Sequence, residues 1–347
     1  MKRLTLLGVC AAMLALGACA AAPRAPATSL SQAGLKASNA FATDVRTLST
    51  QLAYVDAADA FSSTYERCVG RPTCTPRELS PAQEALQEEL RTERRNLAAA
   101  VAARATALDA LGAAYSALEQ EAASNGSADL EGAARRLVTG VNSYVDSVST
   151  LTGNPIASVI SAPVGEVISG ITAEVGERRQ RRRIIAGSRA IATAVQSLRN
   201  ALSEESRVFD TMDDYVVLHR TGVLRAMLDS GLASRSPTFT SFAQNMNITP
   251  APGAEGVIAS SVAVRAALDA VVEANARADV IAMQQRYRMS LEALDALLVG
   301  HRELEQTRSV SLATIERVIA RLQAVVDAAS QQPQTDAGAD VPIGAQQ

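Results

Sequence analysis

The stretch LEALDALLVGHRELEQTRSVSLATIERVIARLQAVV, residues 291–326, decides the fold class of this chain. Its large apolar residues recur every three or four positions, which is the spacing of one face of an α-helix. They follow one heptad register and comprise Leu291, Leu294, Leu298, Leu312, Ile315, Ile319, Leu322 and Val326. Such a register is typical of helices that pack along one another over their length. We therefore expect one long helix from about 257 to 330.

The same helical spacing extends through most of the chain. Apolar stripes of this period are separated by breaks rich in Ser, Asn, Gly and Pro. The predicted helical segments are 41–65, 81–124, 128–151 and 163–231, with a connector over 231–256. Hydrophobic residues make up 48% of the chain but aromatic residues only 3%, and small alanines suit close helix packing better than sheets. The predicted fold is all-α, an elongated antiparallel helical bundle with coiled-coil-like long helices.

The chain begins with a pattern typical of export signals. Lys2 and Arg3 precede an apolar run over 4–16, and small residues follow the run. The run is too short to span a bilayer as a permanent helix. At its end, the sequence Leu-Gly-Ala-Cys over 16–19 resembles the lipobox of bacterial lipoproteins. An ordinary secretory signal with an incidental cysteine is the alternative.

The resemblance implies cleavage before Cys19, diacylation of its thiol and acylation of the new amino terminus. Two or three acyl chains are enough for stable anchoring. Ala20 follows the cysteine, which by analogy with Gram-negative lipoproteins implies the outer membrane, with the body in the periplasm. A proline-containing tether would then hold the body ~30 Å from the lipid. The expected organisation is a signal peptide over 1–18, a lipidated tether over 19–29, a helical bundle over 30–330 and a disordered tail over 331–347.

Two further cysteines, Cys68 and Cys74, frame a short loop. In an oxidising compartment, an even pair indicates a disulfide bond. A metal pair is the alternative, but neither a histidine nor a second cysteine pair lies nearby in the sequence. We expect the bridge to close the tip of a helical hairpin.

The chain has two histidines, His219 and His301, and both fall on apolar seams. They could be metal ligands or polar core residues that fix the register of helices. If the last two long helices pair in antiparallel fashion, the two rings lie tens of ångströms apart at about 1.5 Å per residue. We therefore expect the core role and no metal.

Catalytic motifs are not evident in the sequence. The adjacent acids Glu204-Glu205 and Asp213-Asp214 are expected on the solvated surface, because neighbours on a helix point to different faces. We find no nucleophile elbow, phosphate loop or zinc signature. The chain is therefore expected not to be an enzyme, with no cofactor and no small-molecule substrate.

The segment 156–173 carries small residues every four positions, which allow helix backbones to approach closely. It could be a membrane-inserting hairpin, but Pro163 and Glu166 interrupt it. A close-packed bend at one end of the bundle is the preferred interpretation. The arginine run that follows could contact anionic lipid or a partner, or pair with acids of a neighbouring helix; it comprises Arg178, Arg179, Arg181, Arg182 and Arg183.

The formal net charge of −3 argues against a dedicated nucleic-acid binder. The sequence favours a lipid-anchored helical bundle that acts as a structural or protein-interaction component of the cell envelope. Its expected partners are the membrane, through the lipid, and an envelope protein or a second copy of the chain. The alternative is a membrane-active or pore-related protein that uses 156–173 and the adjacent arginines.

Overall fold

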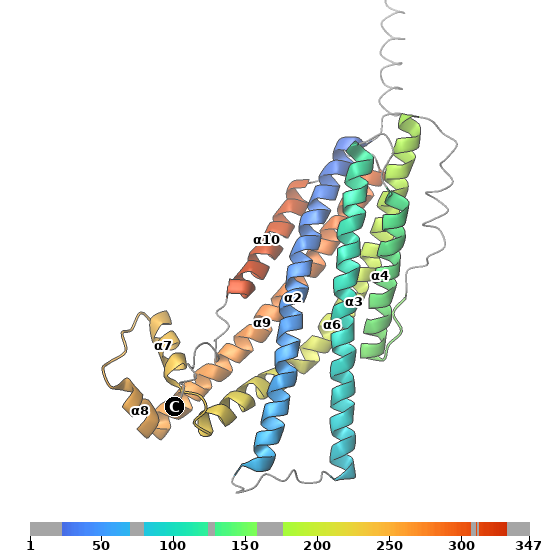
Figure 1. Cartoon of the computed structure of the whole chain (residues 1–347). Helices are drawn as coiled ribbons and strands as arrows, with labels where there is room; N and C mark the ends of the chain where they lie inside the picture. Colours follow the sequence, from blue (N-terminus) through green and yellow to red (C-terminus); the bar gives the residue numbers. More distant parts are fainter. Residues whose placement is uncertain are drawn as a thin grey trace, which may run out of the picture. The chain divides into compact units, whose positions relative to one another are not determined.

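The computed structural model describes residues 23–69, 80–123, 129–157, 176–306, 310 and 312–331 (Figure 1). Every regular element in these residues is helical. The helices are α2 (Arg24–Cys68), α3 (Pro81–Ala123), α4 (Leu130–Thr152), α6 (Glu177–Asp229), α7 (Ser236–Asn245), α8 (Ala254–Ser260), α9 (Val262–Glu305) and α10 (Leu312–Gln331). The predicted all-α helical bundle is confirmed.

The chain divides into two compact units, and the division falls inside five of the helices. Unit 1 contains α2 through Arg46, α3 from Arg91, α4, α6 through Ser206, α9 from Arg286 and α10 through Val326. Unit 2 contains the remaining parts of α2, α3, α6, α9 and α10, together with α7 and α8. The polar clusters described below lie in unit 1.

The core of unit 1 is built from the stripes that the sequence predicts. In the segment predicted to be helical over 163–231, α6 buries an apolar stripe that comprises Ile184, Ile191, Val195, Leu198 and Leu202. Small residues bring the helices together between these stripes. At Gly140 of α4, a Cβ atom would lie 3.2 Å from the Cα atom of Ala107 on α3. The missing side chain at Gly140 allows this close approach of the two helix backbones.

Two helix starts follow the capping rules. Before α3, the Ser80 backbone N–H donates to Gln83 Oε1 at 3.0 Å, and the Gln83 N–H donates back to Ser80 Oγ at 3.4 Å. This reciprocal pair is a capping box, and it confirms the predicted start at Pro81. Before α4, Asp129 Oδ1 accepts from the Gly132 N–H at 3.0 Å.

The expected tether over 19–29 is wrong in its second half. Helix α2 already begins at Arg24, and Ala27 is fully buried. The two prolines at 23 and 26 suggested extended chain, but the first turn of a helix tolerates proline because its N–H groups have no helical partner. The structural core therefore begins six residues earlier than predicted.

The expected single helix over 257–330 is also wrong. The structure divides it into α8, α9 and α10, and α9 ends at Glu305. A Cβ atom at Gly300 would lie 2.7 Å from Leu30 and 2.8 Å from Ile315, so the first turn of α10 packs beside the end of α9. Five polar residues over 305–309 supply no apolar face at the break. Within α10 the predicted seam is buried at Ile315, Ile319, Leu322 and Val326.

Among the described helices, α3 has the length and apolar composition that a membrane span requires, with 44% of its apolar window buried inside the protein. This helix supplies core residues such as Leu97, Leu108 and Leu111. Its apolar character is accounted for by packing in unit 1. Residues 158–173 of the small-residue segment, which was considered as a membrane-inserting hairpin, lie outside the described residues.

Candidate functional site

The structure brings together residues that the sequence did not group. Cys19 and Cys74 lie outside the described residues, and Cys68 is the last residue of α2. Lipidation at Cys19 and a Cys68–Cys74 bridge therefore stay predictions. The backbone of His219 lies within α6, in unit 2, whereas His301 lies in unit 1.

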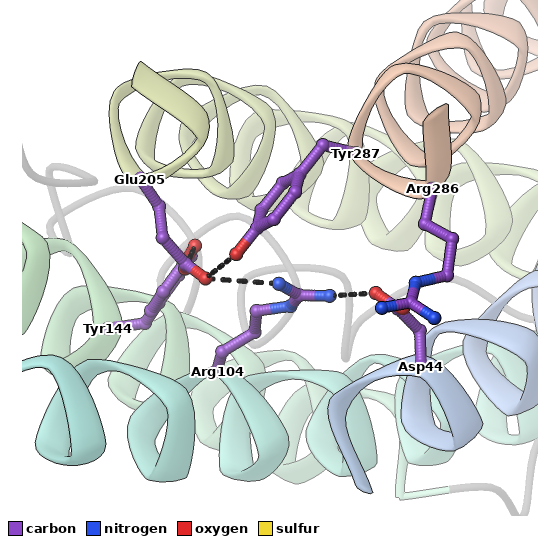
Figure 2. Close-up of polar contacts among 6 residues, drawn as sticks. All are labelled: Asp44, Arg104, Tyr144, Glu205, Arg286 and Tyr287. Atoms are coloured by element: carbon purple, nitrogen blue, oxygen red, sulfur yellow. Dashed lines mark hydrogen bonds and ion pairs between the residues drawn. The ribbon is translucent and has the colours of Figure 1, made fainter. Parts of the chain in front are cut away.

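Unit 1 encloses a layer of charged and phenolic side chains, which we call the charge layer (Figure 2). All of its members are buried, with an exposed fraction of at most 5%. Five of the six helices with residues in unit 1 contribute at least one of them. They are Asp44 from α2, Arg104 from α3, Tyr144 from α4, Glu205 from α6, and Arg286 and Tyr287 from α9.

Glu205 is the acceptor at the centre of the charge layer. Arg104 Nη1 donates to Glu205 Oε1 at 3.1 Å, and Tyr287 Oη donates to the same oxygen at 2.5 Å. Tyr144 Oη donates to the other carboxylate oxygen, Oε2. The guanidinium of Arg104 also lies 5.2 Å from the centroid of the Tyr287 ring, a cation–π distance. Glu205 thus joins α3, α4 and α9 to α6.

Asp44 completes the charge balance. Arg104 Nη2 donates to Asp44 Oδ2 at 2.5 Å, and Arg286 Nε lies 3.1 Å from Asp44 Oδ1. Two arginines therefore face two carboxylates, and the layer is neutral as a whole. Isolated buried charges cost several kcal/mol each, so the four groups depend on one another.

Burial and the paired charges shift the pKa values of the groups in the charge layer. Burial acts to lower the pKa of Arg104, but the carboxylates of Glu205 and Asp44 outweigh it and raise that pKa well above its usual value. Burial raises the pKa of Tyr144 and of Tyr287, and the charge of Glu205 raises both further. The phenols therefore remain donors to Glu205 at physiological pH.

The expectation that Glu204-Glu205 is solvated surface is wrong for Glu205, which is fully buried. The signal was available in the spacing, because Glu205 follows Leu202 by three residues and precedes Phe209 by four. Arg104 falls in the same way between Val101 and Leu108 on α3. A charged residue within an apolar seam, matched by an opposite charge in another seam, marks such a layer.

A second buried polar group confirms the core role predicted for His301. The ring is fully buried, with Nε2 3.0 Å from Tyr115 Oη and Nδ1 2.8 Å from Ser188 Oγ. Gly34 makes room for this group, because a Cβ atom there would lie 2.4 Å from the Tyr115 ring. The three partners come from α3, α6 and α9, so this layer also ties helices together.

The arginine run divides between two faces of α6. Arg183 turns inward, where its Nη2 atom lies 3.0 Å from Oε2 of Glu121, a fully buried carboxylate of α3. Burial raises the pKa of Glu121, and Arg183 and Arg179 oppose that rise. Arg178 and Arg182 are exposed. Pairing with a neighbouring helix therefore accounts for part of the run.

The described residues offer no group of three or more His, Cys, Asp or Glu side chains placed to hold a metal ion. A shallow hollow of about 620 Å³ lies along α4, and all of its lining residues come from that helix, between Val138 and Thr150. Ligand pockets usually have polar groups that converge from several elements. Comparison with protein-family models, curated proteins and solved structures finds no match to this chain.

Glu205→Gln tests whether the charge layer holds unit 1 together. The change keeps the side-chain volume but leaves Arg104 and Arg286 with a single carboxylate. We expect the free energy of unfolding to fall by about 3–5 kcal/mol, the usual cost of breaking a buried pair. Urea unfolding monitored by circular dichroism measures this.

The matched control is Glu204→Gln, at a partly exposed position, which should change stability by less than about 0.5 kcal/mol. Equal effects of the two variants would contradict the assignment.

His301 makes stability depend on pH. Burial lowers its pKa to about 3, whereas the unfolded chain keeps an ordinary value of about 6.5. Between these values the unfolded state binds more protons, so the free energy of unfolding falls as pH is lowered. Relative to His301→Gln, the wild-type protein should lose about 2 kcal/mol between about pH 6 and pH 4. Urea unfolding at both pH values measures this difference. A constant difference between the two proteins would show that the ring protonates freely in the folded state.

Proposed function

We propose that this chain is a lipid-anchored, non-enzymatic helical scaffold of the bacterial cell envelope that binds a protein partner. Cys19 would carry the lipid, most simply in the outer membrane with the body in the periplasm. The partner would be another envelope protein or a second copy of the chain. Unit 1 would act as the rigid body and unit 2 would supply the contact.

The observation that carries the interaction is the exposure of apolar side chains around the α6–α9 connection in unit 2. Ten large apolar side chains are exposed among the described residues, and six of them fall between 232 and 262. They are Leu232, Phe242, Met246, Ile248, Val257 and Val262. Single exposed apolar residues are ordinary, whereas a concentration of them is typical of interaction sites. We call these six residues the connector cluster.

The chemistry of unit 1 supports a scaffold better than an enzyme. The charged and phenolic groups of the charge layer are closed to solvent and pair with one another. A substrate could not reach them without opening the bundle. Perturbed pKa values often mark catalytic sites, but structural ion-pair networks perturb pKa values in the same way. Here the burial supports the structural role.

Position-specific photocrosslinking in living cells tests the proposal. A photoreactive residue at Met246, which is 57% exposed, should give a discrete protein adduct. The matched control is Val299 of α9, which is also apolar and 41% exposed but lies in unit 1. A photoreactive residue at Val299 should give little or no adduct. In the proposed interface only the connector cluster lies against the partner, so only these positions are close enough to crosslink.

The size of the adduct distinguishes the two kinds of partner. An adduct of twice the chain mass indicates self-association, and any other discrete mass indicates a different envelope protein. Absence of an adduct at every connector position, or equal adducts at Val299, would contradict the interaction. Leakage of dye from vesicles at low protein concentration would instead favour the membrane-active alternative.

A further inference from the structure

The first turns of α6 lie at the end of unit 1 where α2 begins. Arg24, the first residue of α2, has its Nη2 atom 4.0 Å from Oε1 of Glu177, the first residue of α6. The last turns of α3 lie there too, since Gln180 Nε2 donates to the backbone oxygen of Glu121 at 2.7 Å. We call this end, formed by the start of α2, the end of α3 and the start of α6, the arginine end.

The arginine end carries a local excess of positive charge. Among the described residues of this end, six arginines, Arg24 and the five of the run, face three glutamates, Glu119, Glu121 and Glu177, which gives a net charge of +3 in a chain of net charge −3. At the start of α4, the acids Asp129 and Glu131 pair with Arg136 and Arg135 and add no net charge. Glu121 is fully enclosed and paired inward with Arg183. The excess is therefore presented by the outer face of α6.

The outer face is defined by Arg178 and Arg182. These residues are four positions apart, so they lie on the same side of the helix, and both are exposed. Guanidinium groups bind phosphate oxygens through paired hydrogen bonds. A pair of exposed guanidiniums one helical turn apart suits a surface of phosphate head groups.

The position of the helix start brings this face to the membrane. Only five peptide links separate Cys19 from Arg24, and an extended chain advances about 3.5 Å per residue. The start of α2 can therefore stand no more than about 17 Å from a lipidated Cys19. This reach is much shorter than that of the longer tether expected from the sequence. Electrostatic attraction to an anionic surface acts over about 10 Å. The short link to Cys19 allows the arginine end to come within that distance of the membrane surface.

We propose that the arginine end of unit 1 binds anionic lipid head groups of the anchoring membrane through Arg178 and Arg182. The orientation rests on the lipid anchor of the proposed function. Contact at this end would hold unit 1 against the bilayer by a second point beside the acyl chains. The inward arginines, Arg179 and Arg183, serve the fold and do not form the contact.

The test uses the unlipidated chain from Ala20 onward, which contains every residue that the structure describes. Cosedimentation with vesicles should show binding to phosphatidylglycerol-containing vesicles at low salt, and no binding to phosphatidylcholine vesicles. The bound fraction should fall at high salt because the attraction is electrostatic. Arg178→Gln/Arg182→Gln should weaken binding roughly thirtyfold.

The matched control is Arg91→Gln/Arg95→Gln. These arginines are also exposed, also four residues apart and also in unit 1, but Arg95 lies 26 residues from Glu121 along α3, about 39 Å at 1.5 Å per residue. The control should bind like the wild-type chain. Circular dichroism should show the same helicity for all three proteins.

Several outcomes would overturn the lipid contact. They are equal binding to both vesicle types, equal losses in the two double variants, or binding to polyglutamate without binding to vesicles, which would indicate an acidic protein partner. Fatty-acid labelling of the wild-type chain and of Cys19→Ser tests the anchor separately. Labelling without vesicle binding rejects the arginine contact and keeps the anchor. Vesicle binding without Cys19-dependent labelling rejects the anchor and keeps the contact.

Discussion

Four charges removed from water constrain unit 1: Arg104, Arg286, Asp44 and Glu205. A buried charge is tolerated only where its partner meets it with good geometry, and here the partners come from α2, α3, α6 and α9. Sliding any one of these helices by a single turn moves its charge by about 5.4 Å, which separates the pair. The charge layer therefore fixes the alignment of the helices as well as their contact.

The apolar core alone would not impose this alignment. Its stripes of alanine, leucine and valine repeat with nearly constant spacing, so a shifted pairing would bury a similar apolar area. The His301 layer and the inward face of the arginine run add two further fixed points, through Ser188 and Glu121. Such a body is well suited to hold a binding surface in place, which is the role proposed for this chain.

The local patterns of the sequence predicted what depends on local physics. The helices, the start of α3 at Pro81, the buried seam of α10 and the core role of His301 all followed from spacing and residue type. The spacing places Glu205 in an apolar seam, but its buried state was missed because the charge that compensates it, Arg104, lies 101 residues away. The start of α2 was misplaced because proline suits both extended chain and a first helical turn. The break before α10 was missed because the apolar register resumes after five polar residues.

A double-mutant cycle tests the central claim most directly. Arg104→Met, Glu205→Gln and the combination would be compared with the wild-type protein by urea unfolding. If the charge layer acts as one unit, the two changes should not add, and the coupling should reach about 2 kcal/mol or more, as for residues in one buried network. Additive effects within about 0.5 kcal/mol, the behaviour of distant sites, would show that the layer does not hold the helices together.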